Sequence, residues 1–139
     1  MESVFLTKEM LLDVQDELAI EKVDLKTSKG VLRGHVYVRE MTAKEKDTWE
    51  GSLRKEMPAI GGQKGGQQTE IKMNLADYRT KLAICTLCDA NGERIFDMLP
   101  KTIAALGKQL SATNMEAIAD TANRLNKITE EDQDALVKN

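Results

Sequence analysis

Residues 19–41 read AIEKVDLKTSKGVLRGHVYVREM, and this stretch decides the expected fold. Val23 and Leu25 alternate with charged residues before the TSKG segment, and Val36 and Val38 alternate with polar residues after it. Alternation with period two and β-branched content predict two strands, which form a β-hairpin around that segment. Because an isolated hairpin is only marginally stable in water, one of its faces is expected to pack on helices.

A helix is predicted before the hairpin, over residues 7–18. Leu11, Val14 and Leu18 fall on one face of such a helix. Thr7 is a suitable N-cap, because its hydroxyl can accept a hydrogen bond from a free backbone N–H of the first turn.

A second helix is predicted after the hairpin. Thr42–Glu45 read TAKE, a capping box that opens a helix over about residues 43–55, which Pro58 is expected to end. A glycine-rich segment at about 58–70 follows and is expected to be a flexible loop. A phosphate-binding loop is the alternative, but Lys64 lacks the hydroxyl residue that should follow it.

Further helix starts are predicted in the second half of the chain. Asn74 can cap one helix, and Pro100 suits the first position of the next, which Gly107 should weaken or end early. Thr113–Glu116 and Thr129–Asp132 resemble two more capping boxes. The sequence therefore predicts a mainly α fold: a small helical domain of about five helices, with one short β-hairpin near the N-terminal third.

Composition limits the classes of partner. The 139 residues favour a single domain, residues 1–139, and 41% hydrophobic residues suffice for a core. The net charge of −3 gives no electrostatic attraction to nucleic acid or anionic lipid, so neither partner is expected. The start of the chain lacks the pattern of a secretory signal, no apolar run is long enough to span a bilayer, and two cysteines suit a reducing cytoplasm.

Residues able to perform chemistry are few. Cys85 and Cys88 form a CTLC motif, but with His35 as the sole histidine they supply three of the four ligands of a structural zinc site. Residues 86–97, TLCDANGERIFD, start like a calcium loop at Asp89, yet glycine arrives too early. Asn91-Gly92 within this stretch instead predicts a tight turn. We therefore expect no catalytic residue, no metal and no cofactor, and buried packing for both thiols.

Four segments in order resemble the tail assembly chaperones of long-tailed, siphovirus-type bacteriophages. They are FLTKEMLL, VYVREMTAKEKDTWE, LAICTLCDANGERIF and RLNKITEEDQDALVKN. The chain departs from the family pattern in the length of its glycine-rich stretch and in Lys127, where the family pattern has glycine.

The resemblance implies a non-catalytic protein of the host bacterial cytoplasm that is absent from the mature virion. Its partners would be the tape measure protein, which it keeps soluble, and the major tail protein, reached through a longer frameshifted form. We also expect self-association. A structural virion component, such as a head–tail or tail protein, is the alternative. Amphipathic helices would supply the partner-binding face, through six apolar residues: Leu99, Ile103, Leu106, Met115, Ile118 and Leu125.

Overall fold

The computed structural model describes residues 3–58, 69–73, 77–132 and 135. The elements in chain order are α1 (Lys8–Asp13), β1 (Ile20–Lys26), β2 (Leu32–Arg39), α2 (Ala43–Ser52), β3 (Arg54–Pro58), β4 (Thr69–Met73), α3 (Tyr78–Thr86), β5 (Leu87–Cys88), α4 (Pro100–Gln109) and α5 (Ala112–Leu125). Within this described part of the chain, none of the helices combines the length and the apolarity that a bilayer crossing requires.

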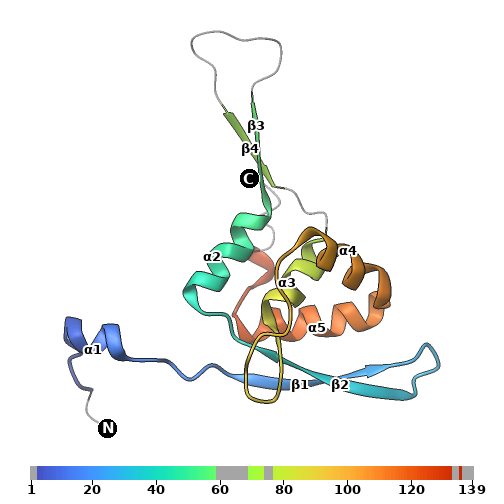
Figure 1. Cartoon of the computed structure of the whole chain (residues 1–139), viewed down its shortest axis with the longest axis horizontal. Coiled ribbons are helices and arrows are strands. Elements are labelled where there is room, and N and C mark those ends of the chain that lie inside the picture. Colours follow the sequence, from blue (N-terminus) through green and yellow to red (C-terminus); the bar gives the residue numbers. More distant parts are fainter. Residues whose placement is uncertain (1–2, 59–68, 74–76, 133–134, 136–139) are drawn as a thin grey trace.

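The predicted hairpin is confirmed, and it forms the centre of a larger sheet. β1 pairs antiparallel with β2, and β2 pairs antiparallel with β5, which gives the strand order β1-β2-β5. Val23 lies opposite Val36, so the two apolar runs share one face. That face meets α5, which lies along the hairpin in Figure 1. The alternation in the sequence therefore predicted both the pairing and the buried face.

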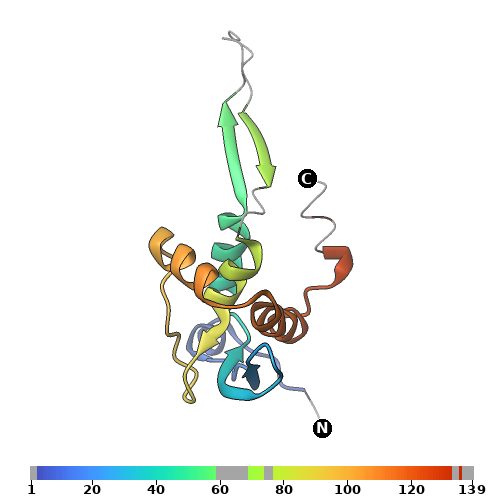
Figure 2. The ribbon, with the colours of Figure 1, turned by 90° about the vertical axis from the view of Figure 1, so that its right-hand side faces the viewer.

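The core lies between the sheet and the helices. Leu82 of α3, Ile118 of α5 and Val38 of β2 are all fully buried there, together with Trp49 of α2. Figure 2 shows α5 nearly end-on, with the sheet below it and the ribbon formed by β3 and β4 projecting away from the helices. The hydrophobic effect thus holds α2, α3 and α5 on one face of the sheet.

The fold class predicted from the sequence is wrong. The chain is a mixture of helix and sheet, with an antiparallel three-stranded sheet rather than a mainly α fold with one hairpin. Two pairings were missed: β5 adds to β2 directly after α3, and β3 pairs with β4 in register from Arg54 opposite Met73 to Pro58 opposite Thr69. A two-residue strand is too short to show a period, and β3 does not alternate cleanly, so neither pairing leaves a readable pattern.

The first helix is shorter than predicted and separate from the core. Thr7 caps it as expected, since its Oγ1 accepts a hydrogen bond from Met10 N at 3.3 Å. The helix ends at Asp13, however, and the backbone of Val14 is extended. Figure 1 shows α1 held away from the body, joined to β1 by an extended segment.

The second helix starts where predicted and ends early. Thr42 and Glu45 form both hydrogen bonds of the capping box. Pro58 does not end this helix: α2 stops at Ser52, and Pro58 belongs to β3. Most of the predicted flexible loop at 58–70 lies outside the described residues.

The later helix starts that can be compared agree with the prediction, except that the N-cap of α5 lies two residues earlier. Pro100 occupies the first turn of α4, and Thr129 and Asp132 form the reciprocal bonds of a cap. For α5 the cap is Ser111, whose Oγ accepts from Asn114 N at 3.1 Å, and not Thr113 as predicted. Asn74, the predicted cap of α3, lies outside the described residues. Gly107 does not end α4 early, because the helix continues to Gln109.

Candidate partner-binding surface

The turn predicted within residues 86–97 is confirmed and shapes one surface of the molecule. Asp89 Oδ1 accepts hydrogen bonds from Asn91 N at 2.8 Å and Glu93 N at 3.0 Å. Gly92 has a φ of 86°, a backbone conformation that favours glycine. The Asp89 carboxylate therefore stabilises a turn.

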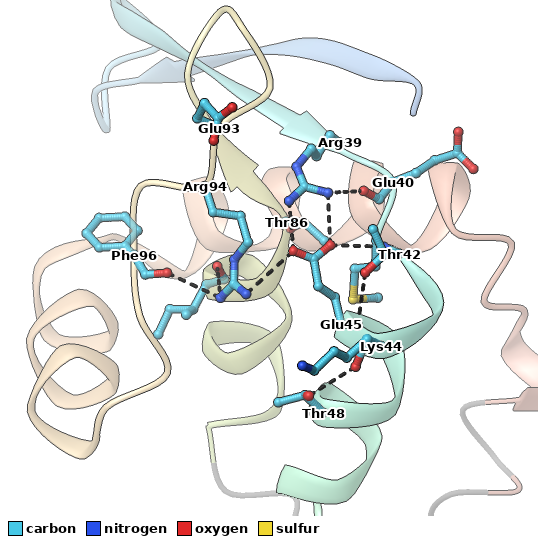
Figure 3. A network of polar contacts seen from close by, with 12 residues as sticks. Arg39, Glu40, Thr42, Lys44, Glu45, Thr48, Thr86, Glu93, Arg94 and Phe96 are labelled. Carbon is cyan, nitrogen blue, oxygen red and sulfur yellow. Dashed lines mark hydrogen bonds and ion pairs between the residues drawn. The ribbon is translucent and has the colours of Figure 1, made fainter. Parts of the chain in front are cut away.

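The segment after this turn is fastened to the body by a cluster of charges. Arg39 of β2 donates two parallel hydrogen bonds to Glu45 of α2, at 2.9 and 2.8 Å (Figure 3). Arg94 approaches the same carboxylate at 3.6 Å, and its other terminal nitrogen donates to Phe96 O at 3.2 Å. One carboxylate thus joins β2, α2 and the segment between β5 and α4.

The surroundings keep Glu45 ionised. Burial alone raises the pKa of this carboxyl group, but hydrogen bonds from Arg39 and from the Thr42 backbone outweigh burial. The positive charges of Arg39 and Arg94 act in the same direction, so the pKa of Glu45 lies below its ordinary value of 4.5. The Nε atoms of both arginines are buried with no hydrogen-bond partner among the described residues. The cluster therefore depends on the Glu45 charge, which sequence analysis placed only in a capping box.

The two cysteines are free and buried, as their packing role predicts. Burial raises the pKa of Cys85 to about 11, and Glu45 adds to this while Arg94 opposes it. Burial also raises the pKa of Cys88. Both groups are therefore neutral thiols near pH 7, a state with little nucleophilic or metal-binding capacity.

Three surface cavities of about 540, 390 and 440 Å³ lie elsewhere on the molecule. None of these three is lined by Cys85, Cys88 or His35. His35 lies on β2 with its ring edge-to-face against Tyr37, 5.3 Å between centroids. Within the described ranges, the Asp, Glu, His and Cys side chains form no group of three that could hold a metal ion.

The structure separates the six residues predicted to bind a partner into three classes. Met115 and Ile118 are buried in the core. Leu106 and Leu125 are partly buried and pack at its edge. Leu99 is 50% exposed, and Ile103, one turn further along α4, is also partly accessible. Partner binding itself stays a prediction, but in this structure the face that offers it is the start of α4.

This α4 face includes a residue that the sequence analysis did not select. Ile95 is 50% exposed and belongs to the segment that Arg94 fastens to the body. Because Arg94 and Phe96 point into the structure, alternation along the extended chain turns Ile95 outward. We define the α4 face as Ile95, Leu99 and Ile103. The alternation after the NG turn was the signal that could have identified Ile95.

A second apolar region lies at the N-terminus. The segment from residue 3 to 19, here called the arm, carries most of the strongly exposed large apolar side chains of the described chain. Phe5 is 88% exposed and Leu12 is 77% exposed. The sequence predicted one amphipathic helix over residues 7–18, but only residues 8–13 of the arm are helical, and its large apolar side chains are exposed.

No family model, curated protein or solved structure matches this chain.

Proposed function

We propose that the chain is a non-catalytic tail assembly chaperone of a long-tailed bacteriophage. It binds the tape measure protein in the host cytoplasm and keeps it soluble, and a longer frameshifted form recruits tail tube subunits. The observation that carries the proposal is apolar surface left uncovered beside a well-packed core, at Ile95 and Leu99, which are each 50% exposed, and in part at Ile103. Exposed apolar surface of this kind marks sites of protein interaction.

The α4 face suits a helical partner. Leu99 is the N-cap of α4, and Ile103 lies in the first turn of the helix with its N–H donating to Leu99 O at 3.0 Å. Both residues therefore lie at the start of α4, and Ile95 precedes them on the fastened segment. A tape measure protein is a long helical chain whose apolar stripes have nothing to cover them before the tail tube forms. Such stripes aggregate when exposed, and a groove-and-helix contact would cover them.

The backbone at Lys127 also supports the resemblance. Lys127 has a φ of 55°, directly after Asn126 at the C-terminal end of α5. Glycine is the residue that favours this left-handed conformation at a helix end. The family pattern has glycine at this position, so the chain adopts the backbone that the pattern calls for with a different residue.

The test is co-expression with the tape measure protein of the same phage, followed by measurement of the tape measure in the soluble fraction. We expect a soluble complex that contains both chains. Leu99→Asp with Ile103→Asp should abolish that complex, because two carboxylates would be buried against an apolar partner. Ala105→Asp is the matched control, since residue 105 is exposed on the same helix but about 200° from residue 103.

Two results would contradict the proposal. The first is a tape measure protein that precipitates equally with and without this chain. The second is recovery of this chain by mass spectrometry from purified virions, which would identify it as a structural head–tail or tail component.

A further inference from the structure

The arm combines exposed apolar groups with negative charge. Its exposed large apolar residues are Val4, Phe5, Leu6, Met10, Leu11, Leu12 and Val14. Between residues 3 and 19 it holds one lysine against four carboxylates, Glu9, Asp13, Asp16 and Glu17, which gives −3. A six-residue helix such as α1 is too short to be stable alone in water. Packing on another surface would therefore stabilise the arm.

A surface of opposite charge lies at the tip of the β1–β2 hairpin, residues 26–33. This hairpin tip carries Lys26, Lys29 and Arg33 with no acidic residue, which gives +3. Val31 and Leu32 lie between these charges, and each is 61% exposed. The hairpin tip thus offers apolar contact bordered by positive charge, which complements the apolar and acidic arm.

A cavity with cationic and hydroxyl-bearing residues in its lining adjoins the hairpin tip. It has a volume of about 440 Å³, and its lining includes Lys26, Arg33, Ser28 and Thr113. Cationic and hydroxyl groups are suitable donors to a carboxylate. The cavity therefore provides a place for acidic side chains of the arm next to the apolar contact.

The arm and the hairpin tip lie at opposite ends of one molecule. The arm enters β1 at Ile20, and the tip follows β1 at Lys26. Seven residue steps, from the end of the arm at Ala19 to Lys26, separate them by about 23 Å at the usual rise per residue. Figure 1 shows the arm directed away from the body on one side and the hairpin tip on the other. Complementary surfaces at opposite ends fit a second copy placed in line.

We propose that the arm of one copy docks on the hairpin tip of the next copy. The contact is head-to-tail, because two different surfaces meet, and repetition of it produces a ring or an open chain of copies. The proposal does not rest on the chaperone function, since it uses neither the α4 face nor a tape measure protein.

The test uses reciprocal charge reversal in the full chain, with mass followed by sedimentation over a wide range of concentration. The wild type should exceed 15.5 kDa progressively as concentration rises. An arm variant (Asp13→Lys with Glu17→Lys) and a tip variant (Lys29→Glu with Arg33→Glu) should each weaken association at least about tenfold, because like charges then face each other. A mixture of the two variants restores both pairings and should associate again.

Matched controls carry the same charge changes elsewhere. Lys101→Glu with Lys108→Glu on α4 corresponds to the tip variant, and Glu130→Lys with Glu131→Lys corresponds to the arm variant. Both controls should associate like the wild type. A wild type that stays at the mass of one chain, reversal variants that associate normally, or a mixture that fails to recover association would each overturn the proposal. A unimodal mass with intact circular dichroism establishes that each variant is folded.

Discussion

Helices α1 and α5 begin with the same kind of N-cap but differ in length and in burial. Thr7 caps α1 at 3.3 Å and Ser111 caps α5 at 3.1 Å, each through a hydroxyl that accepts from a backbone N–H. α1 has six exposed residues, whereas α5 continues for fourteen and buries Ile118 in the core. A cap selects where a helix begins, but packing of an apolar face decides how far it extends and how stable it is.

The largest expected effect comes from a Leu→Ala substitution made once in the core and once in the arm. Leu82→Ala in α3 removes a fully buried side chain and should lower the free energy of unfolding by about 3–4 kcal/mol, through lost burial and a new cavity. Leu12→Ala in the arm removes a side chain that is 77% exposed. This substitution should change the free energy of unfolding by less than about 0.5 kcal/mol. Urea denaturation at low protein concentration measures both.

Low concentration is essential to this comparison, because association of the arm would add stability at high concentration. A cost above about 1 kcal/mol for Leu12→Ala in the monomer would show that the arm packs on its own body. The contrast between the two regions would then be lost.

The next effect concerns a polar contact that only the body contains. Glu45→Gln retains the shape of the side chain but leaves Arg39, whose side chain is 8% exposed, without its counter-charge. We expect a loss of about 2 kcal/mol in the free energy of unfolding at pH 7, since the Arg39 guanidinium loses charge-assisted hydrogen bonding while it stays mostly buried. Glu116→Gln on the exposed side of α5 is the control and should be nearly neutral.

The pH dependence of this loss has a definite sign. The folded-state pKa of Glu45 lies below 4.5, so its contribution is complete above that value and is lost as the pH falls through the lowered pKa. The difference in stability between wild type and Glu45→Gln should therefore shrink in acid. A difference that stays constant between pH 7 and pH 3 would show that the Glu45 charge does not stabilise the cluster.

The elements that the sequence predicted correctly show a regular hydrophobic alternation or a capping motif. The alternation of Val23, Leu25, Val36 and Val38 predicted the hairpin, and Thr42–Glu45 predicted the start of α2. The pairing of β5 with β2 was not predictable, because it depends on where the end of α3 meets the sheet in three dimensions. The fold class was therefore wrong even though most of the helix starts were right.

The candidate surface was predictable to a smaller extent. Periodicity places Met115, Ile118 and Leu125 on one face of a helix, but it does not say whether a partner or the core covers that face. The structure puts Met115 and Ile118 in the core and leaves Leu99 exposed. Exposure depends on the neighbouring elements, so no pattern within one helix determines it.

The smallest expected effect concerns Lys127, a non-glycine residue that the folded chain holds in a left-handed backbone conformation. Lys127 has a φ of 55°, which is unfavourable for any residue with a Cβ. Ile128, 6% exposed, packs in the core directly after it, and its N–H donates to Asn123 O at 2.8 Å. This packing holds the backbone in place, whereas the well-capped α1 has no such support. Lys127→Gly should therefore raise the free energy of unfolding by about 0.5–1 kcal/mol.

The same substitution should have the opposite sign inside a helix. Lys108→Gly, in the last turn of α4, should lower the free energy of unfolding by up to about 1 kcal/mol. The helical backbone at residue 108 has no strain for glycine to relieve, and glycine loses more backbone freedom than lysine on folding. Thermal and urea unfolding of the two variants beside the wild type measures the pair. If Lys127→Gly destabilises as Lys108→Gly does, the strain at Lys127 is absent. The end of α5 would then be held by its local sequence as much as by Ile128.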